Sequence, residues 1–213
     1  MARPSIAIVD TGSGNLRSVE KALTLAGSRA FVTREAGEVA SADKVVVPGQ
    51  GAFGACMAGL MRDGGGLRDA VLEAIRAGKP YLGICMGLQL LFASSEEEPG
   101  CAGLGVLPGK VVKFRIAAPL KVPHMGWNAC QRPASAAASP VVSVLGDTPD
   151  GTYFYFVHSF YPVPERASDV ALLSEHGETF CAAVAHDNIF ASQFHPEKSQ
   201  RAGLTLLSRF VSL

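Results

Sequence analysis

The chain has 213 residues, of which 48% are hydrophobic and 18% are charged, and its 19 Lys and Arg residues balance its 19 Asp and Glu residues. This composition is typical of a folded domain with a sizeable apolar core, and it excludes both a disordered chain and a strongly basic nucleic-acid-binding protein. A weakly charged surface at zero net charge is prone to association, which favours a protein that is partly covered by a partner.

The sequence lacks the pattern of a membrane span or a secretory signal. The longest informative apolar stretch, Pro80–Ser95, is shorter than the roughly 20 residues that a spanning helix needs, and it contains two glycines and a glutamine. The five cysteines are widely spaced and form no C-x-x-C pair, which argues against a disulfide framework or a zinc site. We therefore expect a cytoplasmic protein without metal or other cofactor, which contacts neither membranes nor nucleic acid.

Short apolar runs alternate with helical patterns in the first half of the chain. The periodicity predicts strands at 6–10, 30–33, 45–47 and 81–84, and helices at 16–26, 67–77 and 86–95. Strands separated by helices of this length are typical of parallel β-α-β units with helices on both faces of the sheet.

The second half of the chain is richer in strands. Strand-like segments occupy 110–114, 153–160, 170–174, 179–185 and 189–194, and a helix is expected at 200–213. Turn signals at Gly177 and Asp187-Asn188 predict hairpins, and the Ala- and Ser-rich stretch Pro133–Pro140 predicts a surface loop. We predict one α/β domain over residues 1–213, with a mixed, mainly parallel central sheet and helices on both faces.

Cys85 lies between a predicted buried strand and a predicted apolar helix, within Gly83-Ile84-Cys85-Met86-Gly87. A side chain at the tip of a tight strand-to-helix turn needs small neighbours two residues away on each side, and the following helix N-terminus stabilises a thiolate. The pattern therefore predicts a nucleophile elbow with Cys in the Ser position. An apolar setting favours a buried packing role for the other cysteines: Cys56, Cys101, Cys130 and Cys181.

His195-Pro196-Glu197 follows the predicted strand 189–194 and offers a base with an orienting carboxylate. A thiolate that attacks an amide needs a group that protonates the leaving nitrogen, and that group needs an acceptor that fixes its ring. The fixed φ of Pro196 allows the carboxylate to turn back toward the imidazole. The alternative is a histidine in a β-turn beside a solvated glutamate.

The segment Pro48–Gly54 follows the strand 45–47 and formally matches the pattern G-x-G-x-x-G. A dinucleotide site would belong to the first β-α turn and would need an acidic residue at the end of the next strand, whereas Asp69 and Glu73 fall inside a predicted helix. We therefore prefer a loop whose backbone N–H groups face a developing oxyanion beside Cys85, the alternative being a simple tight turn.

The remaining polar candidates have ordinary explanations. The run Glu96-Glu97-Glu98 is typical of a solvated helix end. His176 and His186 lie in turn-like polar segments. His124 and His158 lie in apolar segments, where hydrogen-bonded core histidines are expected.

Together, Gly83–Gln89 and His195–Glu197 resemble the triad glutaminase domain of class I glutamine amidotransferases, which implies a flavodoxin-like fold. Further segments extend this resemblance over nearly the whole chain to the glutaminase subunits of imidazole glycerol phosphate synthases, which act in histidine biosynthesis: 14–18, 48–53, 124–128, 153–160 and 193–199. The segment 124–128 (HMGWN) and the Lys-Ser pair after Glu197 distinguish the chain from the related glutaminases that serve the synthesis of anthranilate, GMP, carbamoyl phosphate and pyridoxal phosphate.

The resemblance implies a catalytic triad of Cys85, His195 and Glu197. The thiol attacks the side-chain amide of glutamine, which gives a glutamyl thioester and ammonia, and the imidazole then activates the hydrolytic water. The positions that match the oxyanion site are Met86 and the loop residues Gly49, Gln50 and Gly51. The positions that match the glutamine site are Gly51, Gln89, Glu97, Ser159 and Phe160, so that one of the three consecutive glutamates gains a role.

The resemblance also implies a heterodimer with a cyclase subunit, which is a β/α barrel that uses the ammonia to build imidazole glycerol phosphate and releases an aminoimidazole carboxamide ribonucleotide. The positions that match the family's interface are Asn15, Arg17, His124, Trp127, Asn128, Tyr155 and Lys198. The sequence departs from the common family pattern at Gln50, where Val is frequent, and at Phe160, where Tyr is frequent. Gln50 is expected to act through its backbone, whereas Phe160 lacks the hydroxyl.

Two other classes of protein compete with a glutaminase. A stand-alone cysteine hydrolase or peptidase could use the same elbow, but Gln89 and the Gly49–Gly51 loop disfavour it. A non-catalytic binding module has no reason to keep a thiol, an imidazole and a carboxylate in these settings. Labelling by a glutamine-analogue diazoketone discriminates among the three, because modification confined to Cys85 supports a glutaminase.

Overall fold

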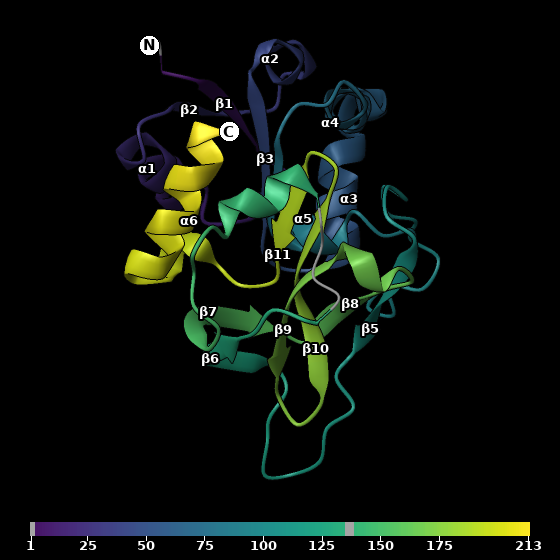
Figure 1. The fold of residues 1–213 in the computed structure, drawn as a ribbon. Coiled ribbons are helices and arrows are strands. Elements are labelled where there is room, and N and C mark those ends of the chain that lie inside the picture. Colours follow the sequence, from purple (N-terminus) through teal and green to yellow (C-terminus); the bar gives the residue numbers. More distant parts are fainter. Residues whose placement is uncertain (1–2, 135–138) are drawn as a thin grey trace.

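A computed structural model describes residues 3–134 and 139–213 of the chain, which form a sheet flanked by helices and extended by two antiparallel strand pairs (Figure 1). The strands are β1 (Ser5–Val9), β2 (Arg29–Thr33), β3 (Lys44–Gly49), β4 (Tyr81–Cys85), β5 (Gly109–Lys113), β6 (His124–Cys130), β7 (Thr152–His158), β8 (Phe160–Pro164), β9 (Val170–Glu175), β10 (Thr179–His186) and β11 (Ile189–Ser192). The helices are α1 (Leu16–Leu25), α2 (Ala36–Ser41), α3 (Phe53–Met61), α4 (Gly66–Arg76), α5 (Met86–Gln89) and α6 (Gln200–Ser212). Part of the predicted loop Pro133–Pro140 lies outside the described residues.

Within the described residues the central sheet has seven strands in the order β2-β1-β3-β4-β11-β10-β9. The neighbours from β2 to β11 pair in parallel, whereas β10 pairs antiparallel with both β11 and β9. The mixed, mainly parallel sheet predicted from the sequence is therefore confirmed, and the order β2-β1-β3-β4-β11 is that of a flavodoxin-like fold. The hairpin turns predicted at Gly177 and Asp187-Asn188 join β9 to β10 and β10 to β11.

The strands of this sheet are buried on both sides because helices cover both of its faces. All residues of β1 and β4 are buried, as expected of parallel strands sandwiched between helices. One apolar cluster joins β1 residues such as Ile6 and Ile8 to α1 and α6, and a second joins Ala7 and Val9 to α2, α3 and α4. Figure 1 accordingly shows α1 and α6 on one side of the sheet and α3 with α4 on the other.

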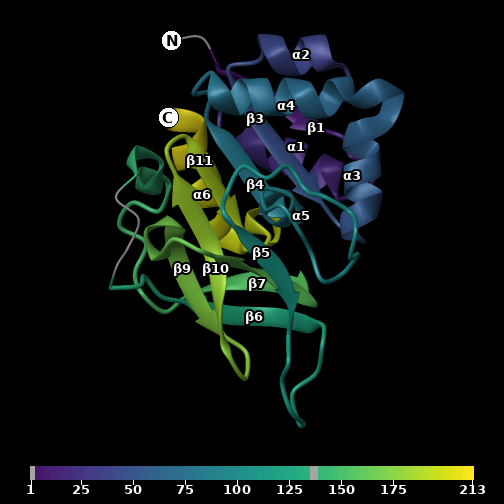
Figure 2. The same ribbon diagram turned by 90° about the vertical axis from the view of Figure 1, so that its right-hand side faces the viewer.

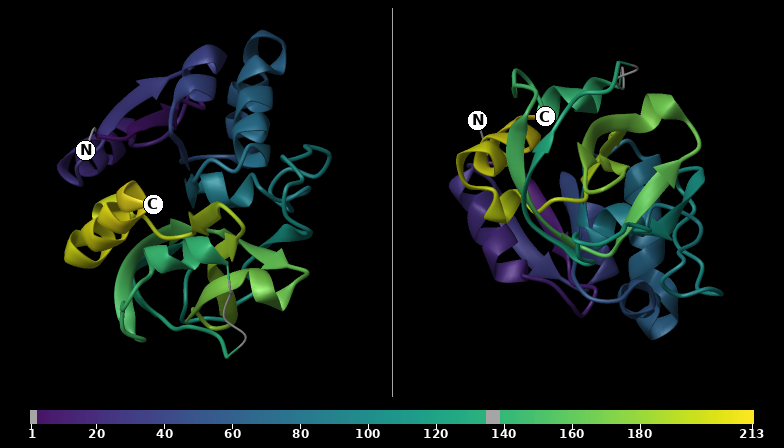
Figure 3. Two further views of the ribbon diagram at one scale, coloured as in Figure 1. Left: turned by 45° about the horizontal axis from the view of Figure 1, so that its top comes forward. Right: turned by 90° about the horizontal axis from the view of Figure 1, so that it is seen from below.

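Two antiparallel pairs extend the molecule beyond the sheet. β6 pairs with β7 and β5 pairs with β8, so the predicted strand 153–160 is in fact divided at Ser159 between two partners. Figure 2 shows β6 and β7 lying across the end of the sheet toward which β4 runs. Figures 1 and 2 show β1 beginning and α6 ending at the opposite end of the molecule from β6 and β7, and in both views of Figure 3 the yellow α6 lies beside the purple N-terminal segment.

The predicted helix 86–95 is wrong in its extent, because helix α5 ends at Gln89. The carbonyl groups of Leu90 and Leu91, which would continue a helix, instead accept hydrogen bonds from the later loop residues Leu104 and Val106. Residues 86–92 are all buried, so this apolar run has no period that separates helix from extended chain.

Helices α2 and α3 and strand β6 were not predicted from the sequence. In α3 the helical period is hidden by glycines and alanines, and Gly59 is required because a Cβ there would overlap the Thr11 carbonyl oxygen. β6 contains Gly126 and places the apolar Met125 and Trp127 on its exposed side, so its sequence lacks the usual pattern of apolar residues facing inward and polar residues facing outward.

Candidate active site

Cys85 occupies the tip of a strained strand-to-helix turn. It ends β4, precedes α5, and has a φ of 54° and a ψ of −100°, a conformation that is costly for a residue with a side chain. The turn is closed by close contacts at the two flanking glycines: a Cβ at Gly83 would lie 2.6 Å from the Gly87 carbonyl oxygen, and a Cβ at Gly87 would overlap the Val47 carbonyl oxygen. These contacts give the steric reason for small residues two positions away on each side, as the motif predicted.

His195 and Glu197 form a buried pair beside this turn. β11 runs parallel to β4 as its neighbour, so the residues after Ser192 reach the same end of the sheet as Cys85. Nδ1 of His195 lies 2.9 Å from Oε1 of Glu197, and the two side chains are 2% and 1% exposed. The His195 N–H donates to the Tyr155 carbonyl oxygen at 2.9 Å, which anchors this segment on β7.

The electrostatic setting keeps the imidazole of His195 protonated. Burial lowers its pKa, but the facing Cys85 sulfur and the Glu197 carboxylate raise it by more, so that the pKa is about 10. Nε2 of His195 and Oε2 of Glu197 have no hydrogen-bond partner among the described residues. An imidazolium next to a thiol stabilises the thiolate, and an unpartnered Nε2 is free to transfer a proton to or from a reacting group.

The loop after β3 packs directly against the turn that carries Cys85. Gly49 is opposite Cys85 in the parallel register, and a Cβ at Gly49 would lie 2.6 Å from Cβ of Met86. Gly51 has a φ of 93°, which a glycine adopts without strain. The predicted oxyanion residues Gly49, Gln50, Gly51 and Met86 therefore lie together beside the thiol, at the N-terminus of α5 and in the loop that leads into α3.

A cavity of about 400 Å³ opens beside Cys85. Its lining includes Gln50, Gly51, Cys85, Met86, Gln89, Glu97, Pro123, Tyr155, Val157, His158, Ser159, Phe160 and Lys198. The structure thus brings together all the residues predicted for the glutamine site. His195 and Glu197 lie behind this wall, buried.

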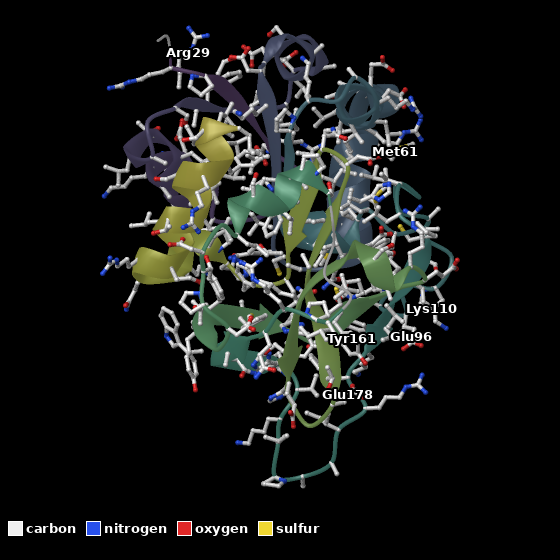
Figure 4. The ribbon with its side chains drawn as sticks, viewed as in Figure 1. Arg29, Met61, Glu96, Lys110, Tyr161 and Glu178 are labelled. Carbon is white, nitrogen blue, oxygen red and sulfur yellow. The ribbon has the colours of Figure 1, made fainter. Side chains whose placement is uncertain are left out.

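Glu96 and Glu97, two of the three consecutive glutamates, have different environments. Glu96 is turned outward (Figure 4), where it accepts from the Lys113 N–H at 3.0 Å and pairs with Arg115, and the Lys113 N–H bond in particular lowers its pKa. Glu97 lines the cavity and accepts from the Phe53 N–H at 2.8 Å, so its carboxylate is fixed at the N-terminus of α3. The interpretation of the run as a merely solvated helix end is therefore wrong for Glu97, which is a fixed carboxylate facing a cavity.

Gln193 and His158 are two polar residues of the site that sequence reasoning did not select. Gln193 is fully buried and its Nε2 lies 3.5 Å from the Cys85 sulfur, while its Oε1 accepts from Gln89 Nε2 at 3.0 Å. His158 lines the cavity and its Nδ1 lies 2.9 Å from the Phe160 carbonyl oxygen. A buried glutamine at the end of an apolar strand, two residues before His195, was the available signal for Gln193.

Most residues predicted to meet a partner lie at the surface near the cavity. Trp127 is 44% exposed, and its ring meets that of Tyr155 edge-on at 6.1 Å, while the Lys198 ammonium lies 5.9 Å from the Tyr155 ring centroid. Arg17 is exposed, and Asn15 and Asn128 are half-buried. We call Trp127, Tyr155 and Lys198 the aromatic patch.

His124, which was predicted to lie at or near a partner interface, is itself buried within the chain. His124 is 4% exposed and its Nδ1 lies 3.0 Å from His158 Nε2. Its ring also stacks on those of Phe156 and His176, which leaves no sizeable surface for a partner. The expectation of a hydrogen-bonded core histidine is the one that holds for this residue.

The described residues bring together no group of three or more His, Cys, Asp or Glu side chains that could hold a metal ion. None of the helices in the described part of the chain is long and apolar enough to cross a membrane. The chemistry available at the site is that of a thiol, a charged imidazole, a buried carboxylate and backbone N–H donors.

Comparisons with known proteins agree with this geometry. Residues 7–212 match the family model of class I glutamine amidotransferases. The chain is 50% identical over 212 residues to the imidazole glycerol phosphate synthase subunit HisH of Syntrophotalea carbinolica, covering 96% of this chain and 98% of that protein. It is 48% identical to the same subunit of Geobacter metallireducens, covering 97% of each chain.

Solved structures show the same fold at low sequence identity. The structure of PurLQS from Thermotoga maritima matches with a TM-score of 0.75 and 18% identity, covering 99% of this chain and 98% of that one. A putative GMP synthase protein from Thermoplasma acidophilum matches with a TM-score of 0.70 and 20% identity, covering 100% of this chain and 94% of that one. The chain therefore belongs to the class I glutamine amidotransferases and, among them, to the family of HisH subunits of imidazole glycerol phosphate synthase.

Proposed function

We propose that this chain is the glutaminase subunit of an imidazole glycerol phosphate synthase, with Cys85, His195 and Glu197 as its catalytic triad. The observation that carries the proposal is the buried thiol, imidazole and carboxylate at the carboxyl ends of two neighbouring parallel strands, with the thiol lining one cavity. The family membership supplies the substrate class, which is L-glutamine.

In this proposal the Cys85 thiolate attacks the side-chain carbonyl carbon of glutamine, and the protonated His195 transfers its Nε2 proton to the leaving nitrogen. Ammonia departs and a glutamyl thioester remains on the sulfur. His195, now neutral, takes a proton from the water that attacks the thioester, which releases glutamate and restores the thiolate–imidazolium pair. Glu197 holds the ring through Nδ1 and stabilises its charged form at both proton transfers.

The oxyanion of each tetrahedral intermediate would be bound by the Met86 N–H at the start of α5 and by an N–H of the Gly49–Gly51 loop. The helix N-terminus adds its partial positive charge to the same point. The proximity of Gly49 to Met86 supports this pairing, because donors from two segments then converge beside the sulfur.

The glutamine would lie in the cavity with its α-ammonium at Glu97, a carboxylate that the Phe53 N–H already fixes. Gly51, Ser159 and Gln89 line the same cavity. The Phe160 carbonyl is already occupied by two donors, Gln89 Nε2 at 3.0 Å and His158 Nδ1 at 2.9 Å. We therefore assign this carbonyl to the fixing of Gln89 rather than to a bond with the substrate.

The partner would be a cyclase subunit with a β/α barrel that binds over the aromatic patch as a heterodimer and receives the ammonia. Tyr155 and Lys198 belong both to this patch and to the wall of the cavity, so a partner seated on the patch would receive ammonia without its passage through bulk water. The exposed Trp127 beside the half-buried Tyr155 is a suitable anchor for such an interface.

The experiment is a coupled assay with the chain, a cyclase subunit of the same synthase class and the ribonucleotide substrate. We expect glutamate release in step with imidazole glycerol phosphate formation. Cys85→Ser should lose both when glutamine is the nitrogen source, whereas added ammonium salts should restore synthesis. Glutamine-dependent synthesis by Cys85→Ser at the wild-type rate would refute the assignment.

A further inference from the structure

The fully buried side chain of Gln193 touches the reacting sulfur. Its Nε2 lies 3.5 Å from Sγ of Cys85, within hydrogen-bond distance for a sulfur acceptor, and its backbone N–H donates to the Ala182 carbonyl at 2.8 Å. A buried primary amide is costly unless its polar atoms are partnered. In this structure one partner of the amide is the thiol itself.

The orientation of this amide is fixed by its neighbours. A carbonyl oxygen can only accept, so the Phe160 carbonyl requires that the NH₂ group of Gln89 face it, at 3.0 Å. The same NH₂ group lies 3.0 Å from the Gln193 amide, which must therefore present its Oε1 there. The remaining end of Gln193, which faces Cys85, is the NH₂ group, so it is a donor to the sulfur.

A second set of hydrogen bonds holds the Phe160 carbonyl in place. Asn128 Nδ2 donates to the Glu175 carbonyl at 2.6 Å and lies 3.3 Å from His124 Nε2, so that Nε2 accepts and Nδ1 of His124 carries the proton. That proton is donated to His158 Nε2 at 3.0 Å, and Nδ1–H of His158 is then donated to the Phe160 carbonyl. The direction of every bond from β6 to the sulfur is thereby determined.

We propose that Gln193 is a further catalytic residue of the glutaminase, whose side-chain N–H donates to the Cys85 thiolate and stabilises it. The catalytic role of Gln193 rests on the proposed function, whereas the contact between Gln193 and Cys85 does not. The thiolate is the form that attacks glutamine and the form that leaves the thioester, and a donor at the sulfur favours it at both points. The imidazolium of His195 supplies charge, whereas Gln193 supplies a donor that cannot be titrated.

The test is the pH dependence of alkylation of Cys85 by iodoacetamide in the full chain, with the modified peptide identified by mass spectrometry so that other cysteines do not contribute. Gln193→Met keeps the size of the side chain and removes the donor. We expect the midpoint of the alkylation profile to rise by about 1 to 2 pH units, as the loss of one hydrogen bond to a charged group requires. Alkylation below both midpoints should slow by about 10- to 100-fold.

Gln193→Glu is the second variant, because it keeps the shape of the side chain if Gln193→Met does not fold. Its ionised carboxylate only accepts and adds a negative charge beside the sulfur, so the midpoint should rise at least as far as in Gln193→Met. Ser192→Ala is the matched control: it removes a buried hydrogen bond to the Phe194 carbonyl in the adjacent position, and should change the melting temperature but not the midpoint.

A folded Gln193→Met or Gln193→Glu variant with a midpoint within about 0.3 pH units of the wild type would overturn the proposal and leave Gln193 a packing residue. Because alkylation needs neither glutamine nor a partner, this result does not depend on whether the chain hydrolyses glutamine. A wild-type chain that never hydrolyses glutamine, yet shows the shifted midpoint in both variants, would refute the glutaminase and keep the donor role at Cys85.

Discussion

Replacement of Glu197 by Gln isolates the contribution of a buried charge to the triad. The bond to His195 is 2.9 Å long and both side chains are almost fully buried, so water does not screen their interaction. An amide in the same place can still accept from Nδ1–H through its oxygen. Glu197→Gln therefore keeps the shape and the hydrogen bond while it removes the negative charge.

The magnitude follows from the pKa of His195, which rises from 6.5 to about 10 in the folded chain. This rise corresponds to roughly 5 kcal/mol in favour of the charged imidazole, shared between the Cys85 sulfur and the Glu197 carboxylate. Loss of the carboxylate should lower the pKa of His195, because the Glu197 charge is one of the groups that raise it. With a less well stabilised imidazolium, kcat for glutamine should fall by about 10²- to 10⁴-fold.

The assay is steady-state glutamine hydrolysis by the complex with the cyclase subunit, at saturating glutamine, for wild type, Glu197→Gln and the exposed control Glu165→Gln. The control should match the wild type. Circular dichroism and a thermal melt establish that the variants are folded. A folded Glu197→Gln variant with a kcat within threefold of the wild type would refute the role of the buried charge.

Three further predictions follow from the same geometry. Cys85→Ser should remain folded with glutamine-dependent turnover reduced by at least about 10³-fold, measured as glutamate release, because a hydroxyl is poorly ionised by one imidazole; turnover within tenfold of wild type would contradict this. Burial lowers the pKa of His124 to about 4 and of His158 to about 3, so the folded state binds fewer protons than the unfolded state below pH 6.5. The free energy of unfolding should therefore fall as the pH falls from 6.5 toward 4. Urea titrations should show a smaller fall in His158→Gln, and an equal fall in the variant and the wild type would count against buried neutral histidines. Trp127→Ala should weaken binding of the cyclase subunit by at least about tenfold in calorimetry, as the loss of an anchor does, while Cys85 still reacts slowly with an affinity label; unchanged binding would place the interface elsewhere.

The gating of the glutaminase is a prediction about the Gly49–Gly51 loop. Peptide reorientation beside a glycine is sterically cheap, and one missing oxyanion donor costs about 3 kcal/mol, or 10²- to 10³-fold in rate. The isolated chain should therefore hydrolyse glutamine slowly and accelerate when the partner and its nucleotide bind, as steady-state rates of the chain, the complex and the liganded complex would show. An isolated chain as fast as the liganded complex would refute the gating while leaving the chemistry of Cys85 intact.

The sequence was sufficient for the parallel sheet and for selecting Cys85, His195 and Glu197 as candidates for a triad, because both depend on local patterns. Apolar runs such as 81–84 mark buried parallel strands, and the glycines around Cys85 mark a turn whose close contacts exclude side chains. His195 and Glu197 are two residues apart, so their pairing needs little information beyond the turn at Pro196.

The rest of the site depends on contacts between distant segments, which local pattern does not record. Gln193 meets Cys85 across 108 positions and Gln89 across 104. Glu97 gains its fixed position from Phe53, 44 residues earlier, at the start of a helix that periodicity did not reveal. His124 was assigned to an interface by the likeness of its segment to a family motif, but the alternation along β6 turns its side chain inward, away from Trp127.

The most direct test of a glutamine site at Cys85 is covalent labelling of the wild-type chain by a diazoketone analogue of glutamine, followed by peptide mapping. We predict one label per chain, on Cys85, with protection by L-glutamine and with no label on the other four cysteines. Labelling of another residue, or labelling of Cys85 that glutamine does not slow, would contradict a glutamine site at this thiol.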